Sequence, residues 1–199
     1  LTGFKFIGEQ IANLEAEGHP ERYVFGFEES YGYLAGTYVR DKDAVIASML
    51  ICEMVAYYKS QGKNLIEVLS ELYDKYGYYY CSQKSFTCEG QAGMKQIADI
   101  MDRLATNPPS EVDGIKVARF DNLNKSESLD IESGKITAIN LPKSNVLGFY
   151  LADGSSLIVR PSGTEPKIKL YISAVGATDS DATAKRTMLE TAGTKLLGF

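Results

Sequence analysis

The stretch from Val146 to Gly176 reads VLGFYLADGSSLIVRPSGTEPKIKLYISAVG. It contains three β-type runs, at 146–151, 156–160 and 167–175, separated by an Asp153-Gly154 turn and by a loop rich in proline and glycine. An Asp-Gly pair between two apolar runs is a strong hairpin signal, because glycine adopts the backbone conformation that such a turn needs. The stretch therefore predicts an antiparallel meander.

The residues around this meander complete a domain of the α+β type. Further β-type runs lie at 78–87, 115–120 and 136–140. The helices expected here lie at 91–105 and from a cap at Thr178 or Asp179 to about Leu197. This order predicts, for residues 76–199, an antiparallel sheet with two helices.

The first part of the chain has the pattern of an α/β domain with too few strands. Helices are expected at 7–17, at 44–60 after Asp41 or Asp43, and from Leu65 to Tyr76 after Asn64. The one strand expected here lies at 22–27, and the glycine-rich loop after it, at 28–36, is expected to use positive φ at Gly32 and Gly36.

The helix at 44–60 is apolar on nearly every face, which is typical of a helix buried between two layers. One strand is too few for such layers, so residues 1–75 are expected to be a truncated mixed α/β domain whose first strands precede Leu1. The domain boundary is expected at Lys75–Gly77. The predicted fold class is thus α/β followed by α+β.

Composition narrows the function classes. The chain has 199 residues and a formal charge of −5, and it has no basic run that would indicate a nucleic-acid surface. Its longest apolar run, Ala44–Cys52, is far shorter than the ~20 residues that span a bilayer. The three cysteines form no C-x-x-C pair, which favours free thiols and a cytoplasmic location. We interpret the single histidine, His19, as a surface turn residue.

Residues 160–167, RPSGTEPK, combine the features of an oxyanion site. The Arg160 guanidinium can make bidentate contacts with phosphate, and Ser162 and Thr164 offer hydroxyl donors. Gly163 is expected to turn backbone amides inward into a nest for an anion. The segment predicts phosphate binding, and the alternative is a polar hairpin with an exposed arginine.

Residues 26–32, GFEESYG, place adjacent carboxylates and a hydroxyl after a strand. Such groups can share hydrogen bonds with neighbouring sugar hydroxyls. A pair of metal ligands and solvated loop charges are the alternatives. Residues 40–43, RDKD, precede a helix that an aspartate can cap, but capping does not explain Arg40 and Lys42, which can face an anionic ligand.

Taken in order, TGFK at 2–5, GFEESYG at 26–32, RDKD at 40–43 and RPSGTEPK at 160–167 resemble the α-D-phosphohexomutase family, and most closely its bacterial α-phosphoglucomutase type. The resemblance covers essentially the whole chain. It implies that this chain holds most of the family's third domain, which binds the sugar, and all of its fourth, which binds the phosphate. Neither the family's T-A-S-H-N-P serine loop nor its D-G-D-x-D-R metal loop is present in the chain.

The resemblance also implies residue roles. The substrate sugar would be bound by Glu28 and Ser30 at its hydroxyls, by Lys42 near its reacting end, and by Thr2 and Gly3 near its ring. The phosphate that is not transferred would be held by Arg160, Ser162, Gly163 and Thr164. Glu29 and Lys5 have weaker claims. No catalytic residue and no metal ligand is expected in this chain.

The reaction implied for the parent protein is the interconversion of glucose 1-phosphate and glucose 6-phosphate through glucose 1,6-bisphosphate, with Mg²⁺ bound outside this chain. The expected partners are sugar phosphates and the preceding domains of the same protein, not nucleic acid or a membrane. The chain alone is expected to be inactive. Phosphomannomutase or phosphopentomutase activity is an alternative within the family, and a non-catalytic sugar-phosphate-binding module is an alternative outside it.

Overall fold

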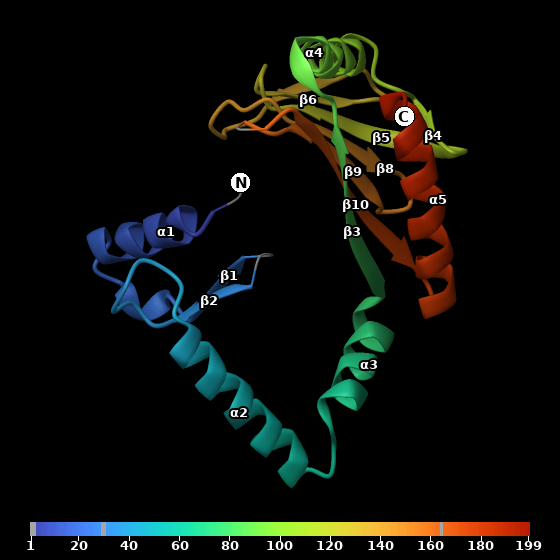
Figure 1. Ribbon diagram of the computed structural model, residues 1–199. Coiled ribbons are helices and arrows are strands. Elements are labelled where there is room, and N and C mark those ends of the chain that lie inside the picture. Colours follow the sequence, from blue (N-terminus) through green and yellow to red (C-terminus); the bar gives the residue numbers. More distant parts are fainter. Residues whose placement is uncertain (1–2, 29–30, 164) are drawn as a thin grey trace. The chain divides into compact units, whose positions relative to one another are not determined.

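The computed structural model describes residues 3–28, 31–163 and 165–199. The chain forms two compact units, Leu1–Ser70 and Glu71–Phe199, and each is described here by itself. The ribbon in Figure 1 labels their helices and strands. No helix in the described ranges has the length and apolar character required to cross a membrane.

The first unit is built around a short β-hairpin. Its elements are α1 (Lys5–Ala16), the 3-10 turn η1 (Pro20–Arg22), β1 (Phe25–Glu28), β2 (Gly32–Ala35), α2 (Ala44–Ser60) and the start of α3 (Leu65–Tyr76). Strands β1 and β2 are antiparallel, and Glu28 pairs with Gly32 in their register. A small core of Phe4, Ile11 and Leu34 joins α1 to β2.

Two expectations for the hairpin of this unit were wrong. Strand β2 falls in the range expected to be a loop, because its pairing with β1 outweighs its high glycine content. Gly36 has a positive φ of 84°, as expected, but Gly32 does not; Tyr31 takes the left-handed conformation instead, at φ 64°.

Helix α2 begins where the sequence indicates, since the Asp43 side chain accepts hydrogen bonds from the backbone N–H groups of Val45 and Ile46. The expectation that α2 is buried between layers was wrong, because none of its residues is buried. The helix packs against β2, and a two-stranded hairpin is too small to cover a helix of 17 residues. Figure 1 shows α2 projecting beyond β1 and β2.

Helix α3 has a capping box at its start. The Asn64 side chain accepts from the N–H groups of Ile66 and Glu67, and the Glu67 carboxylate accepts from the N–H of Asn64 at 2.8 Å. The division between the two compact units falls within this helix, after Ser70.

The second unit is an eight-stranded sheet with two helices. In the order β3-β10-β9-β8-β5-β6-β7, every neighbouring pair is antiparallel, and β4 pairs with β5. The strands are β3 Tyr78–Thr87, β4 Glu111–Val112, β5 Ile115–Asn122, β6 Glu127–Asp130, β7 Ile136–Ala138, β8 Leu147–Leu151, β9 Ser156–Pro161 and β10 Lys167–Gly176. The helices are α4 Gly90–Thr106 and α5 Asp179–Leu197.

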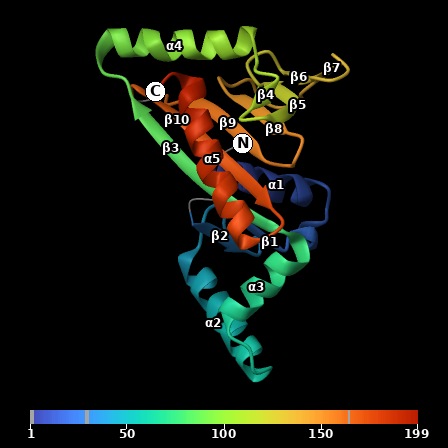
Figure 2. The ribbon, with the colours of Figure 1, turned by 90° about the vertical axis from the view of Figure 1, so that its right-hand side faces the viewer.

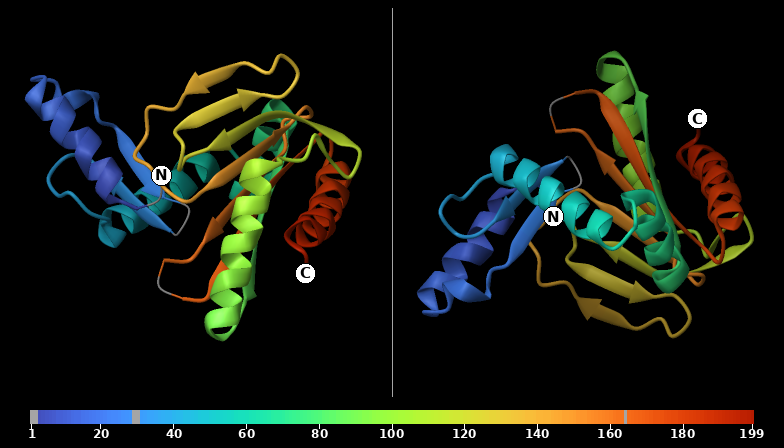
Figure 3. Two further views of the ribbon diagram at one scale, coloured as in Figure 1. Left: turned by 90° about the horizontal axis from the view of Figure 1, so that it is seen from above. Right: turned by 90° about the horizontal axis from the view of Figure 1, so that it is seen from below.

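Both helices share one core with one face of the sheet. Ile97 and Leu104 of α4 and Leu189 of α5 are buried in the same cluster as Phe149 of β8 and Leu170 of β10. Burial alternates along β10, so its other side chains lie on the opposite face. Figure 2 shows α5 lying along β3 and β10, and Figure 3 shows the unit from above and below.

The α+β prediction was confirmed for this unit, including the β8–β9 hairpin at Asp153-Gly154 and the cap of α5 at Thr178. Strands β4 and β6 were not expected. The sequence of β6, ESLD, has little strand character, and this strand is held by its pairing with both β5 and β7. Tertiary pairing therefore overrides local preference here.

Candidate functional site

In the first unit, the GFEESYG segment includes the end of β1 and the start of β2. Glu28 ends β1 and Gly32 begins β2, so the hairpin register places these two residues opposite each other. Glu29 and Ser30 lie outside the described residues, as does Thr2. The site is therefore built from Glu28, Lys42 and Gly3.

Glu28 and Lys42 form an ion pair. Lys42 Nζ lies 3.5 Å from Glu28 Oε1, and the Glu28 side chain is 11% exposed while that of Lys42 is 48% exposed. Lys42 also pairs with Asp41 Oδ1 at 3.4 Å. Its hydrogen bond to Asp41, with the added charges of Asp41 and Glu28, raises the pKa of Lys42 above its ordinary value. Lys42 is therefore a protonated cation at neutral pH.

Gly32 makes room for this pair. A Cβ atom at position 32 would lie 2.4 Å from Lys42 Cδ and 2.8 Å from Glu28 Oε1, closer than atoms in proteins approach. The glycine is needed here for close approach and not for a positive φ.

The segment that carries Lys42 is fixed at both sides. The N–H of Asp43 donates to the carbonyl of Tyr33 in β2 at 2.8 Å, and Tyr38 Oη donates to Asp43 Oδ2 at 2.6 Å. That hydrogen bond, with the N–H groups of α2, lowers the pKa of Asp43. Arg40 is exposed, and its guanidinium pairs with Glu15 of α1 and donates to the backbone carbonyls of Thr37 and Val39.

The N-terminal residues approach this site through Phe4. Lys42 Nζ lies 5.7 Å from the centre of the buried Phe4 ring, so Gly3 is next to a residue that the ion pair contacts. Gly3 has φ of 120°, a conformation that strongly favours glycine. Lys5 lies over its neighbour Phe6, with Nζ 5.0 Å from the ring centre.

In the second unit, the RPSGTEPK segment joins β9 to β10. Arg160 lies in β9 opposite Lys169 of β10, on the face away from the helices. The loop is closed by a hydrogen bond from Ser162 N–H to Lys167 O at 2.8 Å and by one from Glu165 N–H to Ser162 Oγ at 3.3 Å. Thr164 is outside the described residues.

The φ of Gly163 lies outside the left-handed region, and a Cβ at this position would meet nothing within 4 Å. A nest of backbone amides is formed by successive residues, and Thr164 lies outside the described residues. The nest expected at Gly163 therefore stays a prediction. The loop is positioned by its closing hydrogen bonds and by the Pro166 carbonyl, which accepts from Cys88 N–H at 2.8 Å.

A cavity of about 470 Å³ lies beside this loop, and the start of α4 forms its other wall. Its lining residues are Gly90, Gln91, Met94, Ser162, Gly163, Glu165 and Pro166. The loop therefore borders an open space that can receive a ligand.

Sequence reasoning missed two cations near Arg160. Lys167 and Lys169 alternate along β10, so both lie on the sheet face that carries Arg160. Lys167 Nζ pairs with Glu165 Oε1 at 3.1 Å. The signal that could have found them is the KIKL pattern, in which each lysine is followed by a buried apolar residue.

The described residues contain no group of three or more His, Cys, Asp or Glu side chains that could hold a metal ion. The Mg²⁺ that the resemblance implies therefore has no ligand set in these ranges, and we assign no step to it. What the described residues offer is two polar sites of different character: a carboxylate–ammonium pair in one unit and a cationic loop in the other.

Comparison with protein families gives two matches. Residues 1–76 match the family described as phosphoglucomutase/phosphomannomutase, alpha/beta/alpha domain III. Residues 101–192 match the family described as phosphoglucomutase/phosphomannomutase, C-terminal domain.

Individual proteins agree with these matches. A phosphoglucomutase of Staphylococcus aureus is 42% identical over 173 residues, which are 87% of this chain and 31% of that protein. A phosphoglucomutase of Staphylococcus epidermidis is 38% identical over 173 residues, which are again 87% of this chain and 31% of that protein. The chain thus spans about a third of the length of these curated relatives.

Among solved structures, the chain is similar to pp63/parafusin from Paramecium, which is described as an exocytosis-sensitive phosphoprotein and phosphoglucomutase in an open form. The match covers 98% of this chain and 32% of the parafusin chain. The TM-score is 0.68 at 20% identity, which shows a shared fold.

Proposed function

Because this chain belongs to the phosphoglucomutase/phosphomannomutase family and carries its domain III and its C-terminal domain, we propose that it is the sugar- and phosphate-binding part of an α-phosphoglucomutase. The parent enzyme interconverts glucose 1-phosphate and glucose 6-phosphate. The observation that carries this proposal is the 42% identity to a bacterial phosphoglucomutase across 87% of the chain.

In this proposal the hairpin site binds the sugar. Glu28 and Ser30 accept and share hydrogen bonds with sugar hydroxyls, Lys42 lies near the reacting end, and Thr2 and Gly3 lie near the ring. The ion pair with Lys42 supports this role for Glu28, because it holds a largely buried carboxylate in one place before the sugar arrives. Hydroxyl recognition needs such fixed acceptors.

The β9–β10 loop holds the phosphate that is not transferred, through Arg160, Ser162, Gly163 and Thr164. Support comes from the position of Arg160 on one sheet face with Lys167 and Lys169. Separate support comes from Ser162 and Gly163, which line the cavity beside the loop. A planar guanidinium makes two parallel hydrogen bonds to phosphate, while the lysines add positive charge.

The reaction proceeds through glucose 1,6-bisphosphate, which must turn around between the two transfer steps. Each end of this intermediate in turn meets the same phosphate loop and the same sugar-binding hairpin. We place the phosphoserine that exchanges the phosphate, and the Mg²⁺ site, in preceding domains of the same protein, which works in the cytoplasm. Within this chain we place the boundary between the sugar domain, 1–75, and the phosphate domain, 76–199.

The test is an assay of the complete gene product, purified from a host that lacks its own phosphoglucomutase. We expect conversion of glucose 1-phosphate to glucose 6-phosphate that depends on glucose 1,6-bisphosphate. Mannose 1-phosphate and deoxyribose 1-phosphate, tested in parallel, distinguish the mannose and pentose activities. Faster turnover of either one than of glucose 1-phosphate would overturn the proposed substrate.

A further inference from the structure

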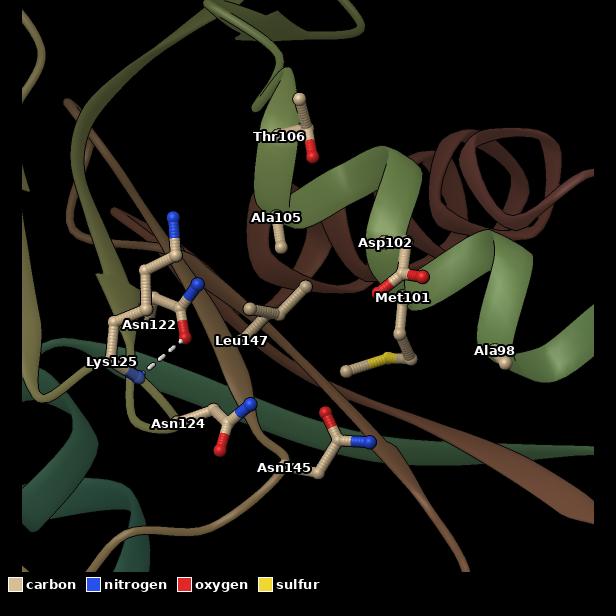
Figure 4. Close-up of a pocket in the computed structure, with 10 residues that line it drawn as sticks. All are labelled: Ala98, Met101, Asp102, Ala105, Thr106, Asn122, Asn124, Lys125, Asn145 and Leu147. Carbon is tan, nitrogen blue, oxygen red and sulfur yellow. Dashed lines mark hydrogen bonds between the residues drawn. The ribbon is translucent and has the colours of Figure 1, made fainter.

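A second cavity in the Glu71–Phe199 unit lies away from the β9–β10 loop. It has a volume of about 250 Å³ and lies between α4 and the β5–β6 turn (Figure 4). Its polar lining residues are Asn122, Asn124, Asn145, Asp102, Lys125 and Thr106. We call it the amide pocket, after its three asparagines.

The buried residue of this group is Asn122. One hydrogen bond fixes its side chain, and the rest of its hydrogen-bonding capacity is unused within the described residues. The residue is 4% exposed, and its Oδ1 accepts from the backbone N–H of Lys125 at 3.1 Å. This hydrogen bond orients the amide, and Nδ2 makes no hydrogen bond to any described residue. The Nδ2 atom itself stays accessible, so it is a donor that water or a ligand in the pocket can accept from.

The other polar groups of the pocket are also available to a ligand. Within the described ranges, the Asp102 carboxylate, the Lys125 ammonium and the side-chain amides of Asn124 and Asn145 have no hydrogen bond or ion pair. Lys125 and Asp102 carry opposite charges, so the lining has no net charge. This balance does not favour an anion such as phosphate, which Asp102 would repel.

We propose that the amide pocket binds a neutral polyhydroxylated molecule of about monosaccharide size. A hydroxyl both donates and accepts, and so does an asparagine amide, so the two groups match each other. The remaining wall is apolar, formed by Ala98, Met101, Ala105 and Leu147, and it suits the C–H surface of such a ligand. The volume lies slightly below the range of about 300–1,000 Å³ for drug-sized ligands, which limits the ligand to a small molecule.

This site is separate from the proposed substrate sites, because it shares no residue with the Glu28–Lys42 pair or with the β9–β10 loop. It therefore does not depend on the proposed function. A free sugar bound there acts as a second ligand of the domain and does not occupy the substrate position.

The test is an NMR titration of the isotope-labelled 199-residue chain with D-glucose, followed through the side-chain amide signals of the asparagines. We expect saturable shifts at Asn122, Asn124 and Asn145, and no shift at these residues with inorganic phosphate. Two results overturn the proposal: no saturable shift with D-glucose, which indicates a pocket that holds water only, or shifts with phosphate alone.

Two variants locate the binding. Asp102→Ala removes an acceptor at an exposed position, and we expect it to weaken binding about tenfold, the equivalent of one good hydrogen bond. The matched control is Asp99→Ala on the same helix, whose carboxylate pairs with Lys95 at 2.9 Å outside the pocket; its affinity should equal that of the unmodified chain.

Asn122→Asp keeps the acceptor for Lys125 N–H and replaces the Nδ2 donor, so it should also weaken binding if the variant folds. Equal affinity in Asp102→Ala and Asp99→Ala contradicts the proposal whether or not Asn122→Asp folds.

Discussion

Lys42 Nζ lies 3.5 Å from Glu28 Oε1, and the Cα of Gly32 passes so close to both side chains that a Cβ there would meet them. The pair joins the end of β1 to the segment before α2, and Asp43 anchors that segment to β2. Glu28, Gly32 and Lys42, which lie apart in the sequence, thus meet at one place and form the ion pair there. This arrangement is the feature of the first unit on which the proposed sugar recognition depends.

Gly32→Ala in the complete enzyme should show whether the ion pair matters for catalysis apart from its effect on the stability of the fold. The new Cβ would lie 2.4 Å from Lys42 Cδ, and a flexible lysine can move away. We expect the free energy of unfolding to change by ~1 kcal/mol or less. The loss of the pair should lower kcat/KM about tenfold or more, the equivalent of one charged contact.

Gly163→Ala tests how the proposed phosphate loop uses this residue. Gly163 has no positive φ, and a Cβ there meets nothing within 4 Å, so we expect the free energy of unfolding to change by ~0.5 kcal/mol or less. Alanine keeps the backbone N–H through which Gly163 is proposed to bind, so KM for glucose 1-phosphate should change by no more than about twofold. A large loss of activity in Gly163→Ala with normal folding would show that the loop holds its ligand in a backbone conformation different from the one described here.

Arg160→Ala tests the phosphate loop. Removing a charge-assisted contact of about 1.5–3 kcal/mol should raise KM for glucose 1-phosphate about ten- to a hundredfold. Arg22→Ala is the control, because Arg22 is an exposed arginine in a surface pair with Glu17. Unchanged kinetics for Arg160→Ala would mean that the RPSGTEPK segment is only a structural hairpin and does not bind phosphate.

The 199-residue chain alone should not convert glucose 1-phosphate. The residues proposed here bind sugar and phosphate, and the group that donates the phosphate is proposed to lie in preceding domains. A coupled assay for glucose 6-phosphate, with material from a host that lacks phosphoglucomutase, measures this directly. Sustained turnover by the chain would show that it contains a phosphate donor of its own.

Tyr80 should make the second unit sensitive to alkali. Its hydroxyl donates to Asp179 at the start of α5, and this hydrogen bond raises the pKa of Tyr80 from 10.0 to about 12. A raised pKa means that the stabilisation is present below pH 10.0 and is lost as the pH rises towards about 12.

Urea denaturation across this pH window should therefore show a smaller decline for Tyr80→Phe than for the unmodified chain. Tyr79→Phe is the control, because the adjacent side chain points to the other face of β3 and its hydroxyl makes no hydrogen bond to any described residue. Identical pH dependence in Tyr80→Phe and the unmodified chain would mean that the bond to Asp179 does not contribute.

Much of the fold could be predicted from local sequence patterns. Strand β3 begins and ends at the residues expected, and Asp43, Asn64 and Thr178 cap their helices as expected, because alternation and capping are local signals. Strand β6 could not be predicted, since only its pairing with β5 and β7 makes it a strand. The exposure of α2 could not be predicted either, because an apolar helix sequence does not reveal what packs against it.

The site was partly predictable. The motifs indicated Glu28, Lys42 and Arg160 as candidates, but they did not reveal that Glu28 and Lys42 touch, nor that Gly32 is needed for their contact. Contacts between residues far apart in sequence depend on the hairpin register, which a single sequence does not specify. The alternating lysines of β10 became visible as neighbours of Arg160 only through the pairing of β9 with β10.

The central claim is that the cationic loop binds phosphate and the carboxylate site binds sugar, and an NMR titration of the isotope-labelled chain with inorganic phosphate tests it most directly. The Arg160 loop attracts an anion, whereas the Glu28 carboxylate repels one. The account predicts saturable shifts of the backbone amides of Ser162 and Gly163, with no shift at Gly32. Shifts at Gly32 with none at Gly163 would contradict it.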